Sequence, residues 1–112
     1  MLTFLEVAGL VYTVNDPEIR YTENKTAVAS FTVAVNSNWT DEGGSKHEDS
    51  CFIDCVAWNK LAESIIKFGV SKGDPLYVKG LLKQERWESK EGQKHSKHVL
   101  TVIRIVFLKP KE

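Results

Sequence analysis

Four large aromatic side chains are poorly placed for a hydrophobic core. Trp39 and Trp87 lie in polar stretches, and Phe52 and Trp58 alternate onto one face of a short strand whose other face is small and apolar. Tryptophan is costly to leave exposed, so these rings indicate a binding surface. Lys and Arg are interleaved with them, a combination typical of single-stranded nucleic-acid binding, because bases stack on rings and cations neutralise phosphates. The alternative is that the rings cap the ends of a barrel or fill a protein interface.

Charge is divided unevenly along the chain. Residues 1–78 hold six Lys or Arg and eleven Asp or Glu, a net −5, whereas residues 79–112 hold nine and four, a net +5. The formal net charge is therefore zero, yet a basic C-terminal third can still bind a polyanion through its local potential. A solvated hairpin of mixed charge is the alternative. The basic residues around Trp87 are Lys83, Arg86, Lys90 and Lys94.

Catalytic and metal-binding patterns are weak. His47, Cys51 and Cys55 are spaced four apart, but four residues of a strand span about 13 Å, too far for both thiols to hold one zinc ion. Two core thiols are the favoured interpretation. His95 and His98 are expected to be solvated, with an incidental divalent-metal site as the alternative. The sequence has no phosphate-binding loop, no dinucleotide-binding glycine pattern and no nucleophile elbow, so nothing favours an enzyme.

Length and composition indicate one soluble domain. The chain has 112 residues, of which 42% are hydrophobic and 27% charged. No apolar run approaches the roughly 18 residues of a membrane span. Residues 1–6 lack the basic region of a signal or transit peptide. Two cysteines fit a reducing, cytosolic setting better than a disulfide scaffold.

The periodicity predicts five strands and one helix. Residues 26–36 alternate apolar and polar, as a half-buried strand does. Asn59 is the expected N-cap of a helix that ends at Gly69 or Gly73, and residues 37–50 are expected to form a polar loop. The predicted strands are 2–14, 26–36, 51–58, 75–83 and 98–108, with a charged hairpin over 84–97. This order predicts a single all-β domain over 1–112, an OB-fold with a five-stranded Greek-key barrel and a helix between strands three and four. Other small α+β or barrel folds remain alternatives.

Two of these strands, 2–14 and 98–108, are apolar on both faces. One small barrel has only one interior, so the second face of each strand needs another covering. We expect a second subunit to provide it.

The chain resembles the bacterial and organellar single-stranded DNA-binding proteins. The resemblance covers nearly the whole chain in order, through residues 16–22 (DPEIRYT), 26–36 (TAVASFTVAVN), 52–63 (FIDCVAWNKLAE), 72–73 (KG), 77–82 (YVKGLL), 86–88 (RWE) and 91–94 (EGQK). It implies an OB-fold, a homotetramer wrapped by single-stranded DNA, and stacking at the same four rings. It also implies phosphate contacts from Lys60, Lys72, Lys83 and Arg86, to which we add Lys94 beside Trp87.

The function implied is to coat and protect exposed single strands during replication, recombination and repair. Neither catalysis nor a cofactor or metal is expected. The expected location is the cytoplasm, with the bacterial nucleoid, or an organelle for a mature, processed form. Two other classes remain open: an RNA-binding or primosome-associated OB-fold protein, and a protein-interaction module.

The chain departs from the family pattern in four places. Glu6 stands near the start of the first strand, where a basic residue is usual, and the glycine usual later is replaced around residues 11–13. The loop after Trp39 is acidic, with Asp41 and Glu42. The chain stops at Glu112, where bacterial members usually continue into an acidic-tipped tail that docks repair and replication enzymes. We therefore expect either a tail-less organellar, phage or plasmid form, or the core of a longer protein.

Overall fold

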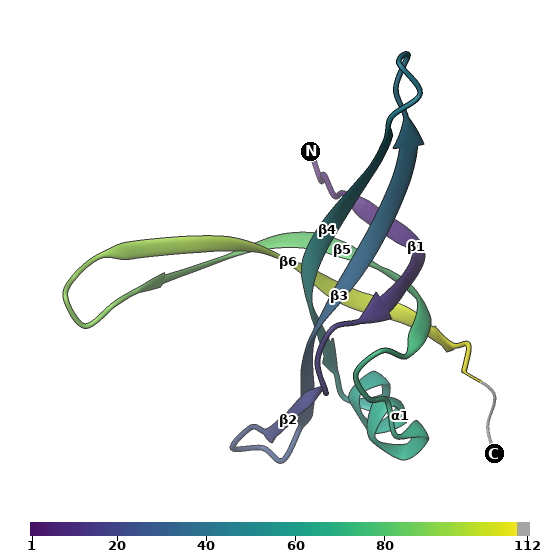
Figure 1. The fold of residues 1–112 in the computed structure, drawn as a ribbon. Coiled ribbons are helices and arrows are strands. Elements are labelled where there is room, and N and C mark those ends of the chain that lie inside the picture. The colour runs from purple at the N-terminus through teal and green to yellow at the C-terminus, as the bar shows by residue number, and fades with distance from the viewer. Residues whose placement is uncertain (110–112) are drawn as a thin grey trace.

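The computed structural model describes residues 1–109 as one curved sheet with a single helix (Figure 1). Residues 110–112 lie outside the described residues, and these include Glu112, where the sequence stops. The elements in chain order are β1 (Glu6–Thr13), β2 (Glu18–Tyr21), β3 (Ala27–Thr40), β4 (Lys46–Trp58), α1 (Lys60–Phe68), β5 (Pro75–Glu88) and β6 (Lys94–Phe107). The predicted all-β chain with one helix before the last two strands is confirmed, and the short strand β2 is an addition to it.

The strands are ordered β1-β5-β6-β4-β3-β2, and β1 also pairs with β3 through Tyr12 and Thr13. All pairings are antiparallel except β4 with β6, which runs parallel over Asp54↔Val99 to Val56↔Thr101. Because β1, at one end of this order, also pairs with β3 near the other end, the sheet bends round a central core. This topology agrees with the predicted OB-fold.

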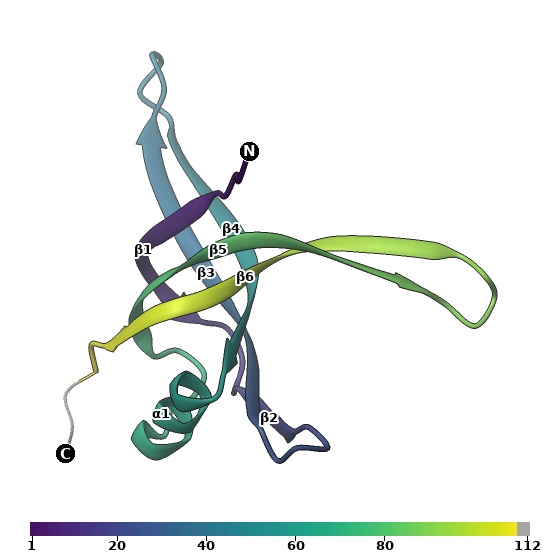
Figure 2. The same ribbon diagram turned by 180° about the vertical axis from the view of Figure 1, so that it is seen from behind.

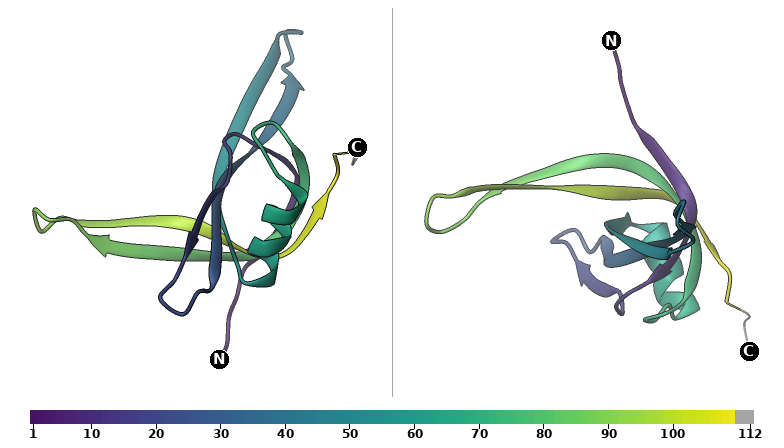
Figure 3. Two further views of the ribbon diagram at one scale, coloured as in Figure 1. Left: turned by 90° about the horizontal axis from the view of Figure 1, so that it is seen from below. Right: turned by 45° about the horizontal axis from the view of Figure 1, so that its top comes forward.

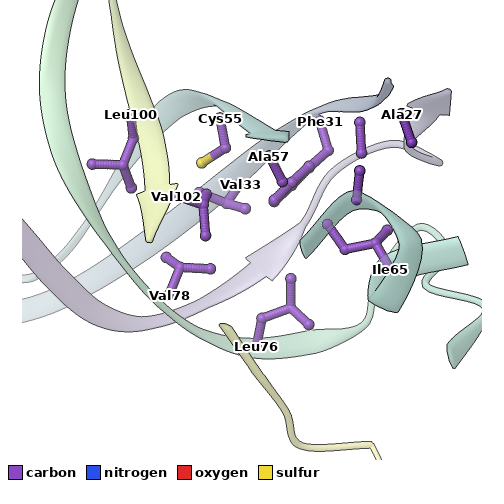
Figure 4. Close-up of a cluster of buried hydrophobic side chains, with 12 residues drawn as sticks. Ala27, Phe31, Val33, Cys55, Ala57, Ile65, Leu76, Val78, Leu100 and Val102 are labelled. Atoms are coloured by element: carbon purple, nitrogen blue, oxygen red, sulfur yellow. The ribbon is translucent and has the colours of Figure 1, made fainter. Parts of the chain in front are cut away.

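The core is formed by one face of each long strand and by α1 (Figure 4). Phe31 and Val33 of β3 point inward as their alternation predicts, and Ala57 of β4 lies opposite Ala29. Ala62 and Ile65 of α1 complete the cluster. Packing of this kind fixes the inner face of β3 and β4. Their other face carries a small second buried cluster of Val28, Val56 and Val99, and it points outward on either side of that cluster.

The helix begins without the predicted cap. Asn59 has φ 57° and its side chain makes no capping hydrogen bond. Its backbone instead donates to the carbonyl of Ala27 at 2.9 Å, which joins the end of β4 to β3. The predicted end at Gly69 is confirmed: the residue has φ 82° and its N–H donates to Ile65 O at 3.1 Å.

Two long hairpins leave the core in different directions (Figures 1 and 2). We name residues 37–50 the β3–β4 arm and residues 83–97 the β5–β6 arm. The expected polar loop over 37–50 is wrong, because β3 and β4 stay paired as far as Thr40↔Lys46. The predicted charged hairpin is confirmed, with pairing out to Glu88↔Lys94. The view from below separates the two arms most clearly (Figure 3).

The cysteines lie in different surroundings. Cys55 is buried in the core as predicted, but Cys51 is exposed, so its assignment to the core is wrong. The reason is the length of β4: Cys51 points to the inner side, but it lies near the base of the arm, beyond the reach of the core.

The strands that are apolar on both faces each bury one face. Val7 and Val11 of β1 pack against the core, while Leu10 is exposed. In β6, Phe107 packs against the core and Val106 is exposed. The first strand begins at Glu6 rather than at residue 2, and residues 2–5 precede it. Within residues 1–109, no helix is both long and apolar enough to cross a membrane.

Candidate nucleic-acid interface

The outer face of β4 carries two of the predicted aromatic residues. Phe52 and Trp58 are 63% and 43% exposed, and Trp39 and Trp87 on the arms are 49% and 46% exposed. Phe52 lies opposite Ala34, and Trp58 lies opposite Val28. Phe52 and Trp58 are six positions apart on the strand, which places them about 20 Å apart along β4. The predicted outward orientation of this face is confirmed.

A groove of about 290 Å³ lies between β2, the outer face of β3 and β4, and the base of the β5–β6 arm. Asp54 lies in its floor, where it accepts a hydrogen bond from Thr32 Oγ1 at 2.9 Å and pairs with Lys97 Nζ at 3.4 Å. Asp54 thus holds a cation that could otherwise face a phosphate. The charged residues that line the groove are Asp16, Glu18, Arg20, Asp54, Glu85 and Lys97.

In the β3–β4 arm, Trp39 is held from two sides. Its ring stacks on His47, with centroids 4.3 Å apart and planes at 17°, and its Nε1 donates to Asp49 Oδ2 at 3.2 Å. His47 Nε2 lies 2.8 Å from Asp41 Oδ2. Asp41 Oδ1 also accepts the backbone N–H groups of the turn, and its hydrogen bond with His47 lowers the pKa of Asp41 below its ordinary value of 3.8. The arm therefore fixes its tryptophan before any ligand arrives.

In the β5–β6 arm, Trp87 stacks on His95, with centroids 5.5 Å apart and planes at 21°. Arg86, the preceding residue of β5, donates to Gln84 Oε1 at 2.8 Å. This arm has five basic and three acidic residues, a net +2, whereas the β3–β4 arm has one basic and four acidic residues, a net −3. Phosphates are thus attracted to one arm and repelled by the other.

Comparison with known proteins decides the family. The model of the single-strand binding protein family matches residues 10–108. The chain belongs to this family. Its relatives include single-stranded DNA-binding protein A of Bacillus subtilis, 40% identical over 96 residues, which are 86% of this chain and 54% of the relative. Another is the single-stranded DNA-binding protein of Deinococcus radiodurans, 38% identical over 100 residues, which are 89% of this chain and 33% of the relative.

This family member spans about half, or less, of the length of these relatives. A solved structure described as a Plasmodium falciparum SSB complex with ssDNA has a TM-score of 0.84 with the chain. The match is 18% identical and covers 97% of this chain and 98% of that chain, so it shows the fold. The OB-fold expected from the sequence is confirmed.

The five predicted phosphate contacts are all exposed but do not form one cluster. Lys83, Arg86 and Lys94 share the β5–β6 arm with Trp87. Lys60 is the first residue of α1, two positions after Trp58. Lys72 lies in the turn before β5, where its backbone N–H donates to Asp16 Oδ1 at 2.8 Å, beside the groove.

Sequence reasoning missed two residues of this surface. The sequence pattern offers His47 only a disfavoured zinc site and predicts a solvated His95, yet each histidine stacks on the tryptophan of its own arm. Each histidine follows its tryptophan by eight residues, and that repeated spacing was the available signal. Within residues 1–109, no group of three His, Cys, Asp or Glu side chains is arranged to hold a metal ion.

Proposed function

We propose that this chain binds single-stranded DNA with little sequence specificity. Bases stack on the four exposed rings, and phosphates pair with basic side chains. The observation that carries the proposal is the exposure of all three tryptophans, none of which is used by the core. The residues proposed are Trp39, Phe52, Trp58 and Trp87 for stacking, and Lys60, Lys72, Lys83, Arg86 and Lys94 for phosphates.

We further propose that the chain, as a single OB-fold domain, coats and protects exposed strands during replication, recombination and repair. The names of the relatives and of the complex with ssDNA support this role. Binding rather than catalysis is the activity, and it needs neither a cofactor nor a metal. The location that fits is wherever DNA is replicated, in the bacterial cytoplasm or in an organelle.

Self-association, as a homotetramer, is the proposed state of the chain. An apolar row crosses the outer face of three strands, because Leu10, Tyr77 and Val106 lie side by side in register. Leu10 and Val106 are exposed, and among residues 1–109 β1 pairs on one side only along residues 6–11. Exposed apolar surface beside an unpaired strand edge favours a second copy. Sedimentation that shows a monomer at micromolar concentration would contradict this state.

The deciding experiment is a titration of the chain with poly(dT), followed by tryptophan fluorescence. Stacking should quench the emission of Trp39, Trp58 and Trp87. Poly(U) in competition separates DNA binding from RNA binding, because discrimination requires contact with the 2′-hydroxyl. Unchanged fluorescence, with no bound oligomer, would reject the proposal and leave a protein-interaction module as the function.

A further inference from the structure

Each arm carries one cross-strand pair of tryptophan and histidine. Trp39 lies directly opposite His47, and Trp87 lies directly opposite His95. Both pairs stack, at 4.3 Å and 17° in the β3–β4 arm and at 5.5 Å and 21° in the β5–β6 arm. The third histidine, His98, lies opposite Gln84 instead. The same cross-strand stack of tryptophan and histidine therefore occurs in two separate segments of the chain.

The arms are two-stranded at these positions. β2 pairs with β3 no further than Ser30, and β6 pairs with β4 only over residues 54–56 of β4. A ring on a two-stranded hairpin has few neighbours to fix its rotamer, and fixing it on binding costs affinity. A cross-strand imidazole at stacking distance supplies such a neighbour.

We infer that His47 and His95 are positioning residues that cover one face of Trp39 and Trp87, so that each indole receives a base on its other face. The inference rests on the proposed function, because it assumes that these tryptophans stack with bases. An indole has two faces, and the histidine occupies one of them. The product of binding at each arm is therefore a three-layer stack of base, indole and imidazole, and each arm takes one base.

The two arms differ in how firmly the pair is held. His47 is anchored by Asp41, and Trp39 by Asp49, so both rings of the β3–β4 pair have a polar partner as well. The β5–β6 pair relies on the stack, which is also the looser of the two. Both arrangements order the indole through ring contact, and a flat apolar ring in place of imidazole should preserve it.

The test uses the full chain with a labelled dT oligomer and fluorescence anisotropy. His47→Ala and His95→Ala should each weaken binding by about two- to ten-fold, the cost of fixing one free side chain. His47→Phe and His95→Phe should restore the affinity, because a phenyl ring covers the same face. His98→Ala is the matched control, since this exposed histidine lies opposite Gln84, and it should bind like the parent. Near-UV circular dichroism of the free variants should show a weakened tryptophan signal in the Ala forms only.

Two results would overturn the inference. One is an unchanged affinity in both Ala variants, and the other is a failure of both Phe variants to restore it, which would assign the histidines a charge or hydrogen-bonding role. His47 and His95 are exposed on the arms, so the variants are expected to fold, and far-UV circular dichroism checks this. Absence of binding by the parent chain would instead reject the proposed function, so the two failures are distinguishable.

Discussion

The β3–β4 arm and the β5–β6 arm share one plan and differ in charge. Both are two-stranded, both expose one tryptophan, and both stack a histidine on it. The first has a net charge of −3 and fixes its rings through Asp41 and Asp49, while the second has a net charge of +2 and carries five basic residues along with Trp87. Ring stacking and phosphate attraction are therefore separable properties, and this chain distributes them unequally between its two arms.

The largest effects are expected from the rings. Trp39→Ala and Trp87→Ala each remove one stacked base, and each should weaken binding to a dT oligomer by about 1–3 kcal/mol. Trp58→Ala on the outer face of β4 should cost a similar amount and serves as the reference outside the arms. Fluorescence anisotropy measures all three losses, and thermal melting shows whether each variant is folded.

Equal losses at Trp39 and Trp87 would establish that stacking is independent of the charge of the arm. A normal affinity for Trp39→Ala would contradict this common plan, because it would mean that the acidic arm does not hold DNA at all.

The second effect concerns salt. Each phosphate neutralised contributes about −0.7 to the slope of log K against log salt for single strands. Replacing Lys83, Arg86 and Lys94 by Ala should therefore make the slope less negative by about 2 in total, whereas Lys46→Ala in the acidic arm should change it little.

For the parent chain we expect a shallow slope, because Asp41, Glu42, Asp54 and Glu85 offset the cations near the proposed path. Titrations over a salt series, beside a typical bacterial relative, provide the measurement. A steeper slope than that of the relative would show that the β5–β6 arm dominates binding.

A smaller effect is expected at the base of the β5–β6 arm. Asp54→Asn keeps an acceptor for Thr32 but releases Lys97 from its 3.4 Å ion pair. Affinity for dT should rise about two- to five-fold, the scale of a partly exposed pair, and the salt slope should steepen. Glu85→Gln, in the same groove, controls for the loss of one negative charge alone. Equal gains in both variants would show that Lys97 itself makes no contact with DNA.

The smallest effect is a pH dependence confined to the β3–β4 arm. The hydrogen bond from His47 lowers the pKa of Asp41 in the folded chain below 3.8, so its contribution to the order of the arm is present above about pH 4. That contribution is lost as the pH falls through the folded pKa. An NMR titration of the Asp41 carboxyl carbon should give a midpoint below 3.8, and Asp41→Asn should broaden the Trp39 indole signal at neutral pH. A midpoint at or above 3.8 would refute the anchoring role.

The parts of the chain that pack against the core were predictable from its sequence. Strands 26–36 and 51–58 alternate because one face of each is buried, and that alternation also placed Phe52 and Trp58 outward. The β3–β4 arm was not predictable in this way, since both of its faces meet water and its strands carry no apolar period. The alternation of residues could not separate Cys51 from Cys55, because both lie on the same face of β4. Which of them is buried depends on where β4 leaves the core.

The contact between Trp39 and His47 required the register of the hairpin, which depends on its turn. The turn is formed by Asp41, whose carboxylate accepts the backbone N–H groups of Gly43 and Ser45. The short strand β2 was overlooked because its four residues, Glu18–Tyr21, are bounded by a turn and carry two charges. Its pairing with β3 supplies one wall of the groove.

The unequal burial of the two cysteines gives the molecule a natural reporter position. Burial, with the nearby charge of Asp54, raises the pKa of Cys55 to about 12, so this thiol stays protonated and shielded from reagents at pH 8. Cys51 is exposed at the base of the β3–β4 arm, and it points to the side of β4 opposite Phe52. A maleimide dye should therefore attach at Cys51 alone. Because Cys51 shares its side of β4 with Asp49 and His47, the dye should report changes around Trp39 at the β3–β4 arm.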